Sequence, residues 1–274
     1  MSVQPVAVAA APRGALSRRV GSRALDWLPA LVVLAVVLVF WQESIAVFHI
    51  KRFLAPQPSA IASTFWDDRS ELLHAGWFTF QEALGGFVVG CSLGIFAALV
   101  LARWPRLSRA LMPYAIAASA VPIIAFAPIT NAWFSPFGKT SKIAIAAVLC
   151  FFPVFVNTLR GLTSVHPASI ELMRSYAAGD IDIFRRVRIP NALPLVFTAL
   201  KIATVLSMIG AIVGEYFGGD FNALGVLINS RSATFAFEEA WAGIGVACAF
   251  GIAFYLVVAG VERLALRSGP STED

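Results

Sequence analysis

The chain has 274 residues, of which 58% are hydrophobic and only 14% are charged. Soluble globular chains carry about 25% charged and about 45–50% apolar residues, so the composition excludes an ordinary water-soluble domain and indicates lipid as the solvent. The formal net charge of +5 does not indicate a nucleic acid partner, because the Lys and Arg residues lie in short loops between apolar runs, which is how membrane topology is encoded.

Six apolar segments are long enough to cross a bilayer, which takes about 20 mostly apolar residues. They cover residues 28–48, 78–102, 110–134, 141–160, 193–217 and 240–263. Backbone groups in hydrocarbon must be hydrogen-bonded within the protein, so each segment is predicted to be helical. The expected fold class is therefore an all-α polytopic membrane protein with six transmembrane helices, forming one domain over residues 28–265 between tails at residues 1–27 and 266–274.

The first segment is preceded by Arg13, Arg18, Arg19 and Arg23, which gives the N-terminus a superficial likeness to a secretory signal peptide. The apolar run continues without a small-x-small cleavage site, so an uncleaved first helix is predicted. Fourteen of the 21 Lys and Arg residues fall on the side of the N-terminus and six on the opposite side, with Lys201 inside the fifth segment. Both termini are therefore predicted to be cytoplasmic, and Lys201 is predicted to snorkel toward the inner boundary.

Small and helix-breaking residues mark several of these segments. Glycine recurs at every fourth position in the second and fifth segments, at Gly86, Gly90, Gly94, Gly210, Gly214 and Gly218. Such stripes allow close approach of helices, either within the chain or at a dimer seam. The third segment contains Pro113, Pro122 and Pro128 and the fourth contains Pro153, each of which favours a kink.

The sequence contains no complete motif for catalysis, metal binding or nucleotide binding. Gly138-Lys139-Thr140 resembles the end of a phosphate-binding loop, but Trp133 stands where the first glycine is required and the tripeptide is on the predicted outer side. The histidines and cysteines show no ligand spacing, and no GxSxG turn is found. We therefore predict no catalytic residue, no metal and no cofactor, and no nucleotide site in this chain.

Residues 163–194 form the longest loop on the predicted cytoplasmic side. Pro167 is well placed to begin a helix, and Gly179-Asp180 predicts a turn between two short helices. Apolar residues recur at helical spacing at Met173, Ala177, Ile181, Phe184 and Val187. The periodicity fits two interpretations equally, an amphipathic unit that docks in another protein's groove or a segment lying on the anionic inner leaflet.

This loop resembles the EAA loop of ATP-binding-cassette importer permeases, whose pattern is Glu-Ala-Ala, three residues, Gly, nine residues, Ile, any residue, Leu-Pro. Glu171 and Pro190 match outright, and Ala177 stands where the glycine is expected. Hydrophobic residues match in kind at Leu172, Met173, Val187 and Ile189. Over residues 75–265 the chain is similar to the nitrate, sulfonate and taurine branch, which includes importers of pyrimidine vitamin precursors. The supporting stretches cover residues 120–128, 184–194, 214–217 and 224–228.

The resemblance implies a type I importer permease in a bacterial inner membrane. Two permease chains, as a homodimer, would form the pathway for a small organic or anionic solute. Two cytoplasmic ATPase subunits and an extracytoplasmic solute-binding protein would complete the assembly. The coupling helix would run from Glu171 to Ala178, with Glu171 and Ala177 as its docking core and Arg174 orienting the partner electrostatically.

Residues lining the pathway are harder to assign from the sequence. Glu215 lies near the outer end of the fifth segment, where it either lines the solute entrance or sits at the membrane interface. Asn131, Asn157 and Ser207 are further candidates. The main alternative is a secondary transporter without an ATPase partner, which would need its own ion-coupling groups and usually internal repeats. A second alternative is a membrane anchor that takes no part in transport.

Overall fold

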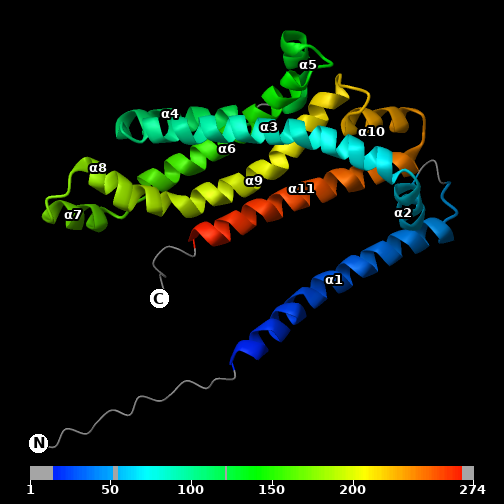
Figure 1. Cartoon of the computed structure of the whole chain (residues 1–274), viewed down its shortest axis with the longest axis horizontal. Coiled ribbons are helices and arrows are strands. Elements are labelled where there is room, and N and C mark those ends of the chain that lie inside the picture. Colours follow the sequence, from blue (N-terminus) through cyan, green and yellow to red (C-terminus); the bar gives the residue numbers. More distant parts are fainter. Residues whose placement is uncertain (1–14, 52–54, 121, 267–274) are drawn as a thin grey trace, which may run out of the picture.

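The computed structural model describes residues 15–51, 55–120 and 122–266, and every regular element in these ranges is helical (Figure 1). In chain order they are α1 (Ala15–Val47), α2 (Pro58–Asp67), α3 (Arg69–Leu101), α4 (Pro105–Ala118), α5 (Ile123–Phe134), α6 (Lys139–Thr163), α7 (Pro167–Ser175), α8 (Asp180–Ile183), the π-helix η1 (Phe184–Arg188), α9 (Ile189–Tyr216), α10 (Leu224–Ala233) and α11 (Phe237–Leu266). The predicted all-α fold is confirmed. The outermost parts of both predicted tails lie outside the described residues.

The core consists of α3, α6 and α9, which pack against one another most extensively. Glycines make this packing possible. A Cβ atom on Gly90 of α3 would lie 2.3 Å from the Ala147 carbonyl oxygen of α6, and a Cβ atom on Gly210 of α9 would lie 2.8 Å from Ala146 Cα. Of the two interpretations of the glycine stripes, packing within the chain is the one the structure bears out at these positions.

Five helices in the described ranges are long and apolar enough to cross a membrane. They comprise Leu28–Val47 of α1, α3, α6, a continuous helix from Asp180 to Tyr216, and α11. The predicted single helix over residues 110–134 is wrong, because α4 ends at Ala118 and α5 begins at Ile123. Pro122, which has no amide hydrogen to donate, immediately precedes α5. Pro153, by contrast, is accommodated inside a continuous α6.

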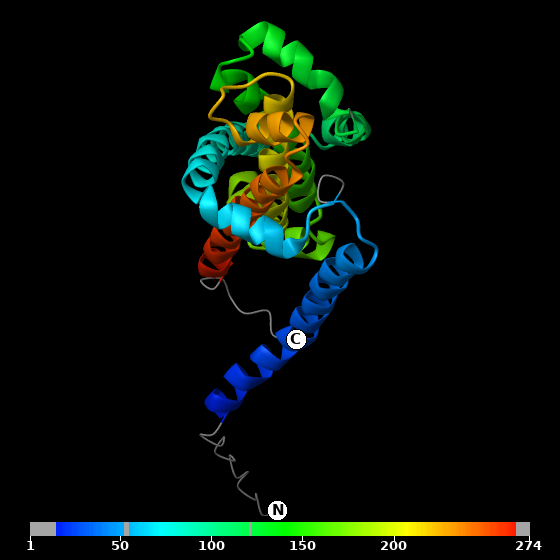
Figure 2. The same cartoon turned by 90° about the vertical axis from the view of Figure 1, so that its right-hand side faces the viewer.

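Helix α1 stands apart from the bundle formed by the other long helices (Figures 1 and 2). It begins at Ala15, well before the predicted start at residue 28, and most side chains from Leu28 onward are exposed. Helix α1 contacts α11 near its own C-terminal end, where the Trp41 and Trp241 rings meet edge to face with their centroids 5.3 Å apart. Gln42 also donates a 3.0 Å hydrogen bond to Ser59 Oγ of α2.

Lys201 forms an ion pair inside the bundle. Its Nζ lies 2.6 Å from Glu262 Oε2 of α11, and both side chains are less than a quarter exposed. A specific partner within the protein therefore compensates the charge of Lys201, and the snorkelling of Lys201 toward the inner boundary stays a prediction.

Candidate functional site

Helix α7 projects at one end of the bundle, together with α8 (Figure 1). Pro167 occupies its first turn, as predicted, and the Ala168 amide donates a 3.3 Å hydrogen bond to the His166 ring nitrogen Nδ1. The predicted turn follows α7, and α8 begins at Asp180. The second short helix does not end there but runs through η1 into α9 without a break.

Ala177 holds the turn in a conformation that glycine adopts more easily. Its φ is +56°, and α7 closes with the two hydrogen bonds of a Schellman motif. The Ala178 amide donates to the Met173 carbonyl (3.1 Å), and the Ala177 amide donates to the Arg174 carbonyl (2.9 Å). The motif glycine is thus replaced by alanine at the position where a left-handed residue is required.

Replacing Ala177 with glycine is expected to stabilise this turn by about 1 kcal/mol, because glycine pays no steric penalty at positive φ. Hydrogen exchange over residues 171–178 should slow by about fivefold, the factor that 1 kcal/mol implies. Ala178, whose φ is not positive, supplies the control. Ala178→Gly should accelerate exchange, and a shift of the same sign in both variants would contradict the assignment.

Helix α7 and the turn that follows it, up to Ile181, form a unit whose exposed surface is partly apolar. Leu172 and Tyr176 are 58% and 78% exposed, and Ile181 beyond the turn also faces outward. Glu171 and Arg174 are exposed beside them, whereas Met173 and Ala178 are half-buried. The predicted apolar stripe does not form one face, since Ala177 and Ile181 are exposed while Phe184 and Val187 are half-buried.

The remaining residues of the motif lie at the base of α9. Val187 lies in η1, Ile189 is the first residue of α9, and Pro190 lies in the first turn of α9. Ile189 packs against the buried cluster that contains Leu162 and Ala192. The nine predicted coupling residues therefore form two groups, one on α7 and its turn and one where the loop joins the membrane helix.

Asn191, which the sequence did not single out, ties this base to α6. Its Nδ2 donates to the Gly161 carbonyl (2.9 Å) and to Ser164 Oγ (3.4 Å).

A cavity of about 530 Å³ lies between this unit and the junction of α3 and α4. Four arginines line it, namely Arg103 between α3 and α4, Arg174 on α7, and Arg185 and Arg188 on η1. Asp180 is the acidic residue among the lining side chains. Four arginines and one aspartate make the lining of this cavity predominantly positive, and the electrostatic role of Arg174 stays a prediction.

The pathway candidates lie in different environments. Glu215 is 1% exposed, and Asn131 of α5 is close to it, donating from Nδ2 to the Gly214 carbonyl (3.4 Å). Asn157 and Ser207 instead bond within their own helices, to the Pro153 and Thr204 carbonyls. Contact of any of these four with a solute stays a prediction, and the structure brings together only Asn131 and Glu215.

Three buried polar residues near Glu215 were not identified from the sequence. Thr79 Oγ1 donates to Glu215 Oε1 (2.7 Å), and Glu82 lies beside Glu215 within reach of the charge of Lys142. Lys142 is itself buried and donates to the carbonyls of Pro136 and Gly138. A carboxylate inside an apolar spanning segment is the signal that could have revealed Glu82.

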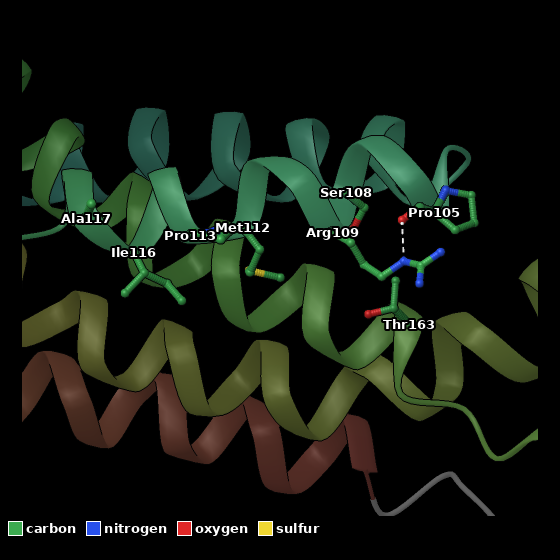
Figure 3. A pocket seen from close by; sticks show the side chains of 8 residues that line it. All are labelled: Pro105, Ser108, Arg109, Met112, Pro113, Ile116, Ala117 and Thr163. Atoms are coloured by element: carbon green, nitrogen blue, oxygen red, sulfur yellow. Dashed lines mark hydrogen bonds between the residues drawn. The ribbon is translucent and has the colours of Figure 1, made fainter.

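A second cavity of about 790 Å³ follows one side of α4 (Figure 3). Its lining is mostly apolar and includes Met112, Pro113, Ile116 and Ala117. Arg109, whose Nε donates to the Pro105 carbonyl (3.2 Å), lies at one end beside Thr163 of α6. The cavity leaves much of α4 without packing partners inside this chain.

Comparison with known proteins places this helical bundle in a family. Residues 90–270 match the binding-protein-dependent transport system inner membrane component. The riboflavin transport system permease of Chloroflexus aurantiacus is 32% identical, the alignment covering 88% of this chain and 91% of that protein. The formylaminopyrimidine transport permease of Halalkalibacterium halodurans is 30% identical over 89% and 97%. The taurine transport system permease of Escherichia coli is 24% identical over 93% and 96%.

These matches cover nearly all of the chain and decide between the interpretations that the sequence left open. A secondary transporter and a membrane anchor are both set aside. The chain is a multi-pass inner membrane permease subunit of an ATP-binding-cassette transporter, and binding-protein-dependent transport implies an ATPase and a binding protein as its partners. It belongs to the family of binding-protein-dependent transport system inner membrane components.

Proposed function

We propose that the segment from Glu171 to Ala178 is the coupling helix of this importer and docks in a cleft of a cytoplasmic ATPase subunit. The observation that carries the proposal is the exposure of Leu172 and Tyr176 at the tip of the bundle, beside Glu171 and Arg174. Exposed apolar side chains rimmed by charged ones are typical of a protein interface. The four arginines around the adjacent cavity favour an acidic rim on the partner.

Movement of the docked unit would pass into the membrane through α9. The helix from Asp180 to Tyr216 is continuous, so a displacement at its inner end displaces the whole helix. Asn191 and Ile189 link the same point to α6. Closure of the ATPase subunits would therefore act as a rigid-body movement of α9 and α6 together, which is one of the usual ways that packed helices transmit a conformational change.

Glu171→Lys is expected to reduce recovery of the ATPase with the tagged chain from native membranes by at least about tenfold, because removing the carboxylate from the docked segment leaves its partner group buried and unpaired, which costs about 2–5 kcal/mol. Solute uptake should fall in parallel. Copurified ATPase is quantified per permease chain, which corrects for any loss of expression.

Asp67→Lys is the matched control, since Asp67 is an exposed acidic residue at the end of α2, at the other end of the bundle (Figure 1). It should leave ATPase recovery at the level of the unsubstituted chain. Unchanged recovery and uptake in Glu171→Lys would exclude the coupling role.

We further propose six crossings, with α4 and α5 together making the third, so that both termini are cytoplasmic. Counting Lys and Arg on each side of the membrane supports this orientation. A second copy of the chain would pack against α4 and α5. The exposed apolar residues there support this placement: Leu107, Leu111, Tyr114, Ile124 and Trp133.

For the solute we propose a small nitrogen heterocycle of the vitamin or vitamin-precursor type. The relatives named for riboflavin and formylaminopyrimidine are 32% and 30% identical, whereas those named for aliphatic sulfonates, taurine and nitrate are 24–28% identical. Calorimetric titration of the binding protein that copurifies with this permease would test the proposal, with riboflavin, a formylaminopyrimidine and taurine as probes. Binding of taurine alone would overturn it.

A further inference from the structure

Helix α10 lies at the end of the bundle opposite to α7 (Figure 1). Its N-terminus needs outside acceptors, because the first amides of a helix have no partners within it. The N-cap residue, Ala223, has no side chain that could accept them. The acceptors come instead from two other helices.

Glu215 of α9 and Thr79 of α3 provide these acceptors. Glu215 Oε2 accepts a 2.6 Å hydrogen bond from the Gly225 amide, and Thr79 Oγ1 accepts a 2.9 Å bond from the Leu224 amide. The Thr79 hydroxyl in turn donates to Glu215 Oε1, so the three helices share one buried network. A carboxylate at a helix N-terminus is also favoured by the helix dipole.

The fit between α10 and α9 leaves no space at this point. A Cβ atom on Gly225 would lie 2.7 Å from Glu215 Oε2 and 2.8 Å from the Ile212 carbonyl oxygen. The other end of α10 is held by Arg231, whose Nη2 lies 3.4 Å from Glu71 Oε1 of α3 and whose Nε lies 2.9 Å from Glu239 Oε2 of α11. Helix α10 is thus fixed at both ends.

The segments that flank α10 are exposed. Phe221 before the helix is 88% exposed and Phe235 after it is 67% exposed. Phe235 projects from a left-handed turn with φ +61°. Exposed aromatic residues are frequent anchors of protein interfaces, and here two of them stand at the two ends of a short helix that is fixed to the bundle.

We propose that Glu215 and Thr79 are positioning residues, which lock α10 to α9 and α3 so that the solute-binding protein, docking on α10, moves these helices as one body. This inference rests on the proposed orientation and partners of the chain. The helix from Asp180 to Tyr216 is 37 residues long, or about 55 Å. The contacts with α10 lie at one end of this helix, and its other end follows the turn after α7. A single helix therefore connects the docking surface for the binding protein with the docking surface for the ATPase.

Thr79→Val tests the lock, because valine keeps the shape of threonine but removes both hydrogen bonds of the hydroxyl. In the complete importer, the binding protein carrying the solute with which it is purified should stimulate ATP hydrolysis about tenfold less than in the unsubstituted assembly. The basal rate and the yield of assembled importer should be retained. Thr79→Ser, which keeps the hydroxyl, should restore stimulation.

Thr158→Val is the matched control, since Thr158 is equally buried but its hydroxyl has no hydrogen-bond partner in the described structure. Normal stimulation in Thr79→Val would overturn the proposal. Loss of basal hydrolysis in an assembled Thr79→Val importer would also overturn it, because the residue would then be needed for hydrolysis itself and not for the response to the binding protein. Glu215→Gln, which can accept on one oxygen only, should reproduce the selective loss if the chain with valine fails to assemble.

Hydrogen exchange at the start of α10 separates this proposal from the function on which it rests. Thr79→Val should speed exchange of the Leu224 and Gly225 amides in the purified chain, whatever the partners are. Unchanged exchange would exclude the lock itself. If exchange responds but the unsubstituted assembly contains no ATPase, then the proposed partners are wrong and the positioning role in transport falls with them.

Discussion

Gly90→Ala is expected to destabilise the chain by about 3 kcal/mol, at the upper end of what overpacking costs. The added methyl carbon would lie 2.3 Å from the Ala147 carbonyl oxygen and 2.9 Å from two further backbone atoms of that residue. A flexible side chain could move aside, but backbone in the middle of α6 can yield only if α3 and α6 separate. Because these two helices share the largest interface of the bundle, their separation should lower the thermal midpoint of the detergent-solubilised protein, followed by tryptophan fluorescence.

Gly260→Ala provides the matched comparison, because a Cβ atom there meets nothing within 4 Å. Alanine is a better helix former than glycine by about 1 kcal/mol, so this variant should be neutral or slightly more stable. The two substitutions add the same atom in long helices and should act in opposite directions. Equal thermal midpoints for both variants would show that the α3–α6 contact is looser than described.

Breaking the Lys201–Glu262 pair should have the second large effect. Glu262→Gln leaves the Lys201 ammonium unpaired between apolar helices, and an unpaired charge at the centre of a membrane costs about 2.5–3.5 kcal/mol. Lys201 lies near the middle of α9, but its partner Glu262 is about one turn from the C-terminal end of α11. The pair is therefore away from the centre of the membrane, and we expect about 2 kcal/mol in the free energy of unfolding measured by titration with SDS.

The double variant Lys201→Met/Glu262→Gln distinguishes loss of the pair from loss of packing. Replacing both partners by uncharged residues of similar size is often neutral, so much of the stability should return. A double-mutant cycle should therefore give a coupling energy of about 1–2 kcal/mol. Additive losses would mean that the two side chains act independently, despite the 2.6 Å between their charged atoms.

The sequence was sufficient for the class of fold, and local rules explain why. Long apolar segments can only be helices in lipid, and the glycines at four-residue spacing in α3 and α9 lie where helices meet. The start of α7 at Pro167 and the turn before Asp180 also followed from local preferences. The break at Pro122 did not, because a proline within an apolar run predicts a kink and an interruption equally well.

The contacts around Glu215 could not have been predicted. Thr79 and Leu224 are 145 positions apart. Leu224 begins one of the stretches that resemble the family, but nothing in that stretch indicates a contact with Thr79. Their pairing depends on how α3, α9 and α10 pack, which no local pattern specifies. Similarly, the motif alignment placed Ala177 at the glycine position, but only the backbone geometry shows that a left-handed residue is needed there.

The interruption between α4 and α5 has a consequence for what this side of the chain can touch. Hydrocarbon offers no hydrogen bonds, so non-helical backbone at membrane depth is found only where protein covers it or water reaches it. If α4 and α5 together make one crossing, the junction around Ser119 and Pro122 must be turned away from the acyl chains. The junction is then not part of the lipid-facing perimeter of the permease. Annular lipids would instead contact the surfaces of the bundle that face away from this junction.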